Sequence, residues 1–151
     1  MKLKELIIKG TETISSLYPD GEAKEMVYAF LEHHIGTKRH THIMEPMYEV
    51  VDDLAEMALA AFQRMASGEP LQYVIGKAWF YSREFKVGPD VLIPRPETEI
   101  LVSEAVSGSR PSRVLDLCTG SGCIAWTLAL EMPGTKVVAV DISDGALEVA
   151  S

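Results

Sequence analysis

Two acidic residues on either side of a pair of glycines are the part of the sequence best suited to chemistry. Asp116 stands shortly before Gly120 and Gly122, and Asp141 follows roughly 20 residues further on. Glycines at such a turn let the backbone come close to a ligand where a Cβ atom would collide. A carboxylate at the position of Asp141 can accept both hydroxyls of a ribose. The spacing therefore predicts a site for a molecule that contains a nucleoside.

The residues around the glycines have the pattern of a strand, a turn, a helix and a second strand. Residues 114–117 and 137–140 are short apolar runs, which suit buried parallel strands. Residues 124–130 have helical composition, and Pro133-Gly134 ends that helix. We therefore expect a βαβ unit, with Trp126 in its core and the glycine turn at the carboxyl end of its first strand.

Two cofactors compete for this pattern. Gly120, Gly122 and Ala125, followed by Asp141, satisfy a loose dinucleotide fingerprint, which is typical of nicotinamide oxidoreductases. Asp116 argues against that reading, because its carboxylate would face and repel a pyrophosphate. S-adenosylmethionine has no phosphate and carries an ammonium group and a sulfonium cation, which an acid suits. The pattern favours S-adenosylmethionine and leaves a nicotinamide oxidoreductase as the alternative.

Composition limits the class of protein. The 151 residues are 47% hydrophobic and 24% charged, which fits a soluble globular protein with a real core. The net charge of −8 disfavours direct binding to nucleic acid, and no apolar run approaches the roughly 20 residues that span a bilayer. The two cysteines fall within the glycine turn and its helix, so no disulfide framework is indicated. The four histidines lack partners at ligand spacing, and we predict a cytoplasmic protein without a metal site.

The first third of the chain is predicted to be a small bundle of three helices. Apolar residues recur at helical spacing over residues 3–17 and 23–34, where Asp20 is suited to capping and Gly36 to ending the second helix. A third helix is expected to open at Pro46 and to stop at Gly68. The methionines of that run are expected to fill gaps in the core; they are Met47, Met57 and Met65.

Extended structure follows the bundle. Residues 79–81 and 85–87 flank Ser82-Arg83-Glu84 and read as a β-hairpin. Pro96 is expected to open a helix through Val106, and Asp144 is expected to cap a last helix. Two parallel strands are not a stable sheet on their own, so we expect the sequence to be the N-terminal portion of a longer protein.

Three stretches together carry a family resemblance. They are Gly68-Glu69-Pro70-Leu71-Gln72-Tyr73-Val74-Ile75-Gly76, Leu92-Ile93-Pro94-Arg95-Pro96-Glu97-Thr98-Glu99 and Asp116-Leu117-Cys118-Thr119-Gly120-Ser121-Gly122. With them the chain resembles the HemK-type (PrmC-like) release-factor glutamine methyltransferases. The resemblance is specific from Gly68 onward, whereas in residues 1–66 it rests on the helix pattern alone. The resemblance implies an α/β fold: a helical bundle domain and a β-hairpin, then the first half of a Rossmann-like class I methyltransferase domain. It assigns residues 1–68 to a substrate-recognition domain, 69–95 to the hairpin and linker, and 96–151 to an incomplete methyltransferase domain.

The resemblance also implies an activity and a cofactor site. Such enzymes use S-adenosylmethionine to methylate the N5 atom of the glutamine in the Gly-Gly-Gln loop of class-1 peptide chain release factors. The turn would cradle the methionine part of the cofactor through Cys118, Thr119, Gly120, Ser121 and Gly122. Asp141 would hold the ribose and Asp116 would orient the ammonium group. Arg95 and Thr98 would line a flap over the cofactor.

The catalytic Asn-Pro-Pro-Tyr motif of that family has no counterpart in these 151 residues. We therefore assign no catalytic residue and expect the chain by itself to be inactive in methyl transfer. Two alternatives stay open: a non-catalytic module in which residues 1–66 bind a release factor or another protein, and a methyltransferase with another substrate. The sequence leaves the oligomeric state undetermined.

Overall fold

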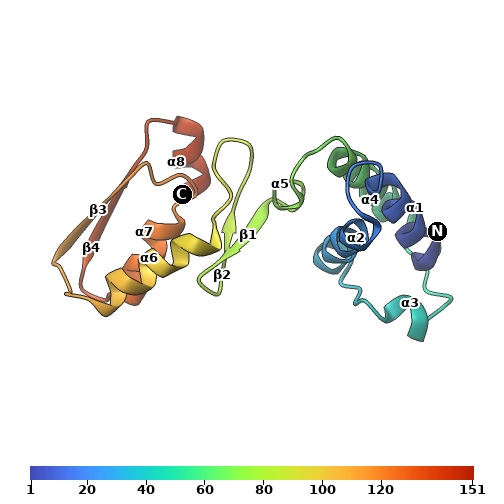
Figure 1. Ribbon diagram of the computed structural model, residues 1–151, viewed down its shortest axis with the longest axis horizontal. Helices are drawn as coiled ribbons and strands as arrows, with labels where there is room; N and C mark the ends of the chain where they lie inside the picture. The colour runs from blue at the N-terminus through green and yellow to red at the C-terminus, as the bar shows by residue number, and fades with distance from the viewer. The chain divides into compact units, whose positions relative to one another are not determined.

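The computed structural model describes residues 1–151 and divides into two compact units, Met1–Ile75 and Gly76–Ser151 (Figure 1). This boundary falls inside the segment 69–95, so that the hairpin belongs to the second unit. The division into domains at 1–68, 69–95 and 96–151 stays a prediction.

Unit 1 is a helical bundle. Its long helices are α1 (Leu3–Ile14), α2 (Asp20–Ile35) and α4 (Asp52–Ala66), and its short ones are α3 (Thr41–Met44) and α5 (Leu71–Ile75). α1 packs against both α2 and α4. The core side chains come from one face of each long helix, as their spacing predicts. Gly36 ends α2 in the left-handed conformation, also as predicted.

The third long helix begins later than predicted. Pro46 lies in a turn, and α4 starts only at Asp52. The intervening residues are held extended by the chain start: the Leu3 amide donates to the Tyr48 carbonyl at 2.9 Å, and the Val50 amide to the Met1 carbonyl at 2.9 Å. A backbone tied to another segment cannot also form helical hydrogen bonds, which explains the delayed start.

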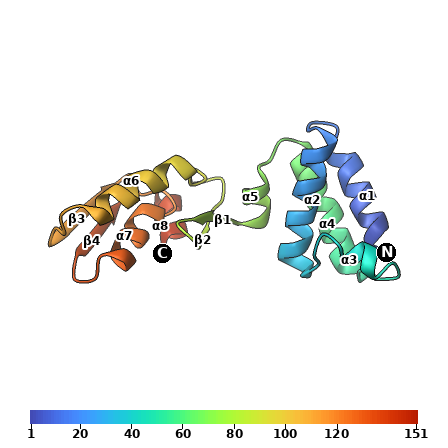
Figure 2. The same ribbon diagram turned by 60° about the horizontal axis from the view of Figure 1, so that its bottom comes forward.

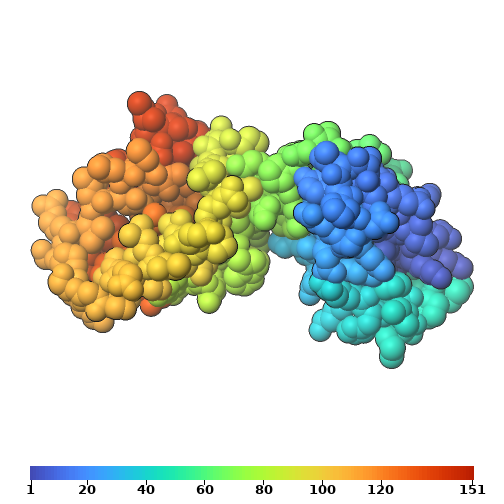
Figure 3. All heavy atoms as spheres, in the orientation of Figure 1, coloured from blue at the N-terminus to red at the C-terminus, as the bar shows by residue number.

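Other details of unit 1 also differ from the prediction. Met47 is 70% exposed and Met57 38% exposed, whereas Met65 is fully buried as expected. Asp20 is the first residue of α2 rather than its cap, and Leu17 lies beyond α1 and is 55% exposed. In the space-filling view the segment around α3 projects from the bundle (Figure 3).

Unit 2 opens with the predicted hairpin, in which β1 (Lys77–Phe80) pairs antiparallel with β2 (Arg83–Lys86). The turn is Tyr81-Ser82 rather than Ser82-Arg83-Glu84. Both turn residues have positive φ, 50° and 61°, as the tightest hairpin loops require. Phe80 and Phe85 are buried, and they anchor the hairpin in the core of unit 2.

The remaining elements are α6 (Pro96–Ser107), β3 (Arg113–Leu117), α7 (Cys123–Glu131), β4 (Lys136–Val140) and α8 (Asp144–Ala150). Pro96 begins α6 as predicted. β3 and β4 are parallel and in register, with Leu117 opposite Val140. α7 packs on these strands, and α6 lies beside α7 in both views (Figures 1 and 2). The predicted βαβ unit is therefore present.

Some apolar side chains of this βαβ unit are exposed, although we predicted them to be buried. The side chains of a strand alternate between two faces. Val114 and Val137 point to the helices and join the core, whereas Leu115 and Leu117 lie on the opposite face and are 57% and 66% exposed. Trp126 is 51% exposed rather than in the core, and its indole N–H donates to the Ala150 carbonyl at 2.9 Å.

Candidate functional site

The glycine turn connects β3 to α7 and has an unusual backbone. Cys118, Gly120 and Gly122 all have left-handed φ values, of 61°, 56° and 77°. The Thr119 amide donates to the Val140 carbonyl at 3.0 Å, which ties the turn to the end of β4. The Gly122 amide donates to the Thr119 carbonyl at 2.9 Å, which closes the turn on itself. The backbone of the turn is therefore held by both strands.

The two glycines are needed for different reasons. A Cβ atom on Gly122 would lie 3.0 Å from the Trp126 side chain and 3.1 Å from that of Ala150, so its small size serves the packing of α7 against α8. A Cβ atom on Gly120 would meet nothing within 4 Å. Gly120 is thus required by its φ angle alone, and it borders open space. We predicted that both glycines make room for a ligand. The structure leaves such room only at Gly120.

Asp141 is fixed by two backbone amides. Its Oδ2 accepts from the Gly120 amide at 2.9 Å, and its Oδ1 accepts from the Ser143 amide at 3.0 Å. These hydrogen bonds, with that from Ser143 the stronger influence, hold the pKa of the Asp141 carboxyl below its usual range. Each oxygen keeps a lone pair for a further donor. Asp141 is therefore an oriented, ionised acceptor beside the turn.

Asp116 lies near the end of β3, directly before the turn, whereas Asp141 follows β4. Its Oδ2 accepts a hydrogen bond from the Thr119 hydroxyl at 2.7 Å, and its side chain is half-buried. Asp116 pairs with Ala139 across the sheet, two residues before Asp141. Because the carboxyl ends of parallel strands lie at one edge of a sheet, the register brings both acids to the turn, as the spacing predicts.

The charge of the site favours a cationic ligand over a phosphate. Residues 114–135 contain neither lysine nor arginine. The charged side chains that bond to the turn are those of Asp116 and Asp141. Thr119 and Ser121 are buried. The Cys123 thiol is buried too, and burial raises its pKa, so it stays protonated. The two carboxylates can accept hydrogen bonds from a cationic or hydroxyl-bearing ligand.

Arg95 and Thr98 lie at the start of α6. Arg95 is exposed and extended, and the Thr98 amide donates to its carbonyl at 3.0 Å. No hydrogen bond or ion pair joins either residue to the glycine turn, so their role in lining a flap stays a prediction.

Two residues that make hydrogen bonds in and near the site had no role in our prediction. Ser143, rather than Asp144, caps α8, since its hydroxyl accepts from the Ala146 amide at 3.2 Å. Its own amide also orients Asp141. The acid followed two residues later by a serine is the signal that identifies such a turn. The second is Glu99, whose carboxylate accepts a hydrogen bond from the Tyr81 amide of the hairpin at 2.7 Å.

No helix has the length and apolar character that crossing a membrane requires. His, Cys, Asp and Glu side chains do not gather in groups of three that would hold a metal ion.

Comparisons with known proteins agree with the resemblance inferred from the sequence. Residues 5–76 match the family model described as the PrmC N-terminal domain. Three similar curated proteins are all named release factor glutamine methyltransferase. That of Koribacter versatilis is 56% identical over 94 residues, covering 60% of this chain and 33% of that protein. That of Neisseria gonorrhoeae is 52% identical over 104 residues, covering 68% and 38%. That of Flavobacterium psychrophilum is 31% identical over 156 aligned residues, covering 99% and 55%.

The chain thus spans between a third and just over half of the length of these relatives. The resemblance predicted from the sequence is confirmed: residues 5–76 match the PrmC N-terminal domain, and the chain is a homologue of the release factor glutamine methyltransferases.

Proposed function

We propose that this chain supplies the helical unit and half of the cofactor site of a cytoplasmic, S-adenosylmethionine-dependent protein-glutamine methyltransferase. Its substrates are class-1 peptide chain release factors, methylated at N5 of the glutamine in their Gly-Gly-Gln loop. The names of the relatives support the reaction. The two acids on the glycine turn support the cofactor. In this proposal unit 2 is the start of a Rossmann-like methyltransferase domain.

Each residue of the site has a physical role in this proposal. Asp141 accepts the ribose hydroxyls with an oriented carboxylate. Asp116, which already accepts from Thr119, offers negative charge to the ammonium group. The turn from Cys118 to Gly122 borders the methionine part, and Gly120 leaves room for it. When bound, S-adenosylmethionine would supply an electrophilic methyl group.

Methyl transfer itself needs groups that this chain lacks. An amide nitrogen is a poor nucleophile, since its lone pair is delocalised, so an enzyme must accept both its hydrogens and aim it at the methyl group. The family motif that does so, Asn-Pro-Pro-Tyr, is absent from these 151 residues. We propose that the chain alone binds the cofactor without methylating a release factor. Methylated glutamine in a purified release factor incubated with the chain would contradict this.

The orientation of Asp141 by two amides is the observation that carries the cofactor assignment. Calorimetric titration with S-adenosylhomocysteine, with NADH as control, tests it directly. We expect S-adenosylhomocysteine alone to bind, and Asp141→Ala to weaken binding at least about tenfold, the loss expected for hydrogen bonds to a charged group. Asp144→Ala removes an exposed acid nearby and serves as the matched control. Binding of NADH alone would favour the nicotinamide alternative instead.

A protein-binding role for unit 1 is favoured by a separate observation. Ile43, Met44 and Met47 are large apolar side chains, 67%, 73% and 70% exposed, in and beside α3. Exposed apolar groups of this kind mark protein contacts. We expect the chain to bind a purified class-1 release factor, and Met44→Ser with Met47→Ser to weaken that binding. Equal binding of the double variant would remove α3 from the interface. Failure of the unaltered chain to bind the release factor would instead favour a methyltransferase for another substrate.

A further inference from the structure

The hairpin turn of unit 2 has a backbone that its own residues do not favour. Tyr81 and Ser82 both carry a Cβ atom, yet both have left-handed φ values, of 50° and 61°. Turns of this type select glycine or asparagine at both positions. Residues held in such a conformation persist only where the surrounding structure holds them there. Contacts from outside the hairpin must therefore fix the turn.

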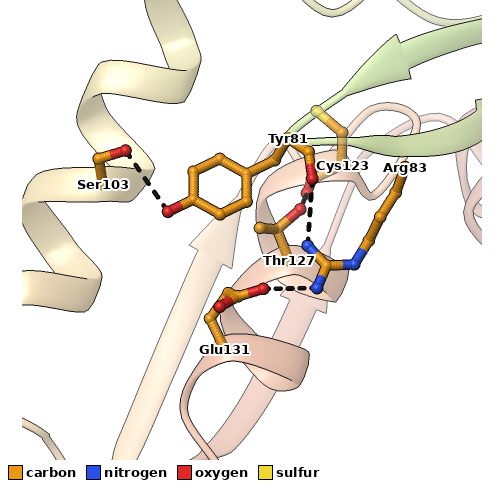
Figure 4. Close-up of polar contacts among 6 residues, drawn as sticks. All are labelled: Tyr81, Arg83, Ser103, Cys123, Thr127 and Glu131. Atoms are coloured by element: carbon orange, nitrogen blue, oxygen red, sulfur yellow. Dashed lines mark hydrogen bonds and ion pairs between the residues drawn. The ribbon is translucent and has the colours of Figure 1, made fainter.

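One such contact comes from the first turns of α6. The Tyr81 amide donates to Oε1 of Glu99 at 2.7 Å. An ionised carboxylate is a strong acceptor, and hydrogen bonds to it are short. The Ser103 hydroxyl, one helical turn further along, lies 3.5 Å from the Tyr81 hydroxyl, at the outer limit of a hydrogen bond (Figure 4). Glu99 thus joins the turn to the same end of α6 that carries Arg95 and Thr98.

A second contact comes from α7. The guanidinium of Arg83 donates to the Tyr81 carbonyl at 3.2 Å and pairs with the Glu131 carboxylate near the end of α7 (Figure 4). Both side chains of this pair are about two-thirds buried, with 34% and 30% exposed. Two different nitrogens of the planar guanidinium donate to these groups, whereas a lysine would have to reach both from a single nitrogen. The hairpin turn is therefore held by α6 and α7.

We infer that Glu99 and Arg83 are positioning residues, which brace the hairpin turn against α6 and α7 and thereby hold the first turn of α6 in place for cofactor binding. This inference rests on the proposed function and adds to it residues that contact no cofactor themselves. α7 begins directly after the glycine turn. Arg95 directly precedes α6, and Thr98 lies in its first turn. A brace between the two helices fixes the distance between the cradle and the predicted flap, so that the cofactor need not order them when it binds.

The test combines a local readout with cofactor affinity. Glu99→Ala removes the acceptor of the Tyr81 amide, and Glu99→Gln keeps an oxygen that can accept it. Glu104→Ala, an exposed acid on the same helix, is the matched control. Amide hydrogen exchange of Tyr81 reports the turn. That of Thr98, whose amide donates to the Arg95 carbonyl, reports the first turn of α6.

We expect Glu99→Ala to speed exchange at both amides by about tenfold or more, and to leave unit 1 unchanged. Its dissociation constant for S-adenosylhomocysteine is expected to rise by about fivefold or more, whereas Glu99→Gln and Glu104→Ala stay near the original value. Ser82→Gly relaxes the backbone of the turn but restores no contact with α6. Adding it to Glu99→Ala should therefore leave exchange at Thr98 fast and the affinity low, whereas restored affinity would show that the contact between the turn and α6 does not serve cofactor binding.

Several outcomes would overturn the inference. Unchanged exchange at Tyr81 would show that Glu99 does not hold the turn, and faster exchange at Tyr81 alone would show that the turn is not coupled to α6. Faster exchange at both amides with unchanged cofactor affinity would show that the brace does not serve binding. If the unaltered chain binds no S-adenosylhomocysteine, the proposed function of the chain fails, and the exchange rates alone decide whether Glu99 couples the hairpin to α6.

Discussion

At the scale of single residues, Cys118 carries the clearest mark of strain in the site. Its φ of 61° is left-handed, and it lies between the last residue of β3 and the buried Thr119. For a residue with a Cβ atom this conformation costs roughly 1–2 kcal/mol of folding free energy. Glycine avoids that cost, but ordering its more flexible unfolded chain costs somewhat less than the same amount. The sequence alone identifies the turn but not which residue of it is strained.

Cys118→Gly is therefore expected to raise the free energy of unfolding by up to about 1 kcal/mol. Cys118→Ala keeps the Cβ atom and should leave stability within about 0.5 kcal/mol, the usual range for exposed positions. Urea unfolding followed by tryptophan fluorescence measures both, since Trp79 and Trp126 lie in the same unit as the turn. A stabilising effect of similar size in both variants would point to the thiol rather than to the φ angle.

Asp141 predicts a pH dependence of stability. The Ser143 and Gly120 amides lower its pKa in the folded chain, so the ionised form is favoured by folding. The resulting stability is fully present above the usual aspartate pKa, near about 3.9, and is lost as the pH falls through the lower value of the folded chain. Asp141→Asn cannot titrate. The difference in urea midpoint between the two proteins should be constant near neutral pH and shrink below about pH 4. A difference that does not change down to about pH 2 would contradict the assignment.

At the scale of elements, Gly10 shows how the bundle packs. Judged by helix propensity alone, Gly10 only weakens α1. In the structure a Cβ atom on Gly10 would lie 2.6 Å from the ring of Phe62 on α4 and 3.0 Å from Val27 on α2. Phe62 and Val27 are fully buried, so neither can move aside freely. The glycine is therefore where three helices approach closely.

We expect Gly10→Ala to destabilise unit 1 by about 1–3 kcal/mol through overpacking, despite the better helix propensity of alanine. Gly21→Ala is the matched control, because a Cβ atom there meets nothing within 4 Å and the residue lies in the first turn of α2. That change should be neutral or stabilising by up to about 1 kcal/mol. Circular dichroism during urea unfolding distinguishes the two, and equal effects would rule out the close packing.

The elements that could be predicted are those specified by local pattern. α2, α6 and the βαβ unit follow from apolar spacing, Gly36, Pro96 and the glycine turn. The start of α4 could not be predicted, because residues 48–50 pair with the chain start, far away in sequence. The exposure of Trp126 and Leu117 was missed for a related reason: an apolar strand or helix does not reveal which of its faces is covered.

At the scale of the whole molecule, the two units have separate hydrophobic cores. The buried core residues of unit 1 all lie between Leu3 and Val74, and those of the unit 2 cluster between Phe80 and Met132. Unit 2 also leaves Leu115 and Leu117 exposed on one face of its sheet, whereas the large side chains of the bundle core are fully buried. Less burial of apolar surface means less stabilisation, so unit 2 should be the weaker unit.

We therefore expect urea to unfold the chain in two steps, with unit 2 first. Both tryptophans lie in unit 2, so their fluorescence follows that unit alone, while circular dichroism at 222 nm is dominated by the three long helices of unit 1. The fluorescence midpoint should fall at lower urea than the main dichroism midpoint, and coincident curves would mean one cooperative unit. S-adenosylhomocysteine should raise only the fluorescence midpoint, because a ligand stabilises the unit that binds it. Gly10→Ala should lower only the dichroism midpoint, and this opposite response in one chain separates the stability of the bundle from that of the cofactor site.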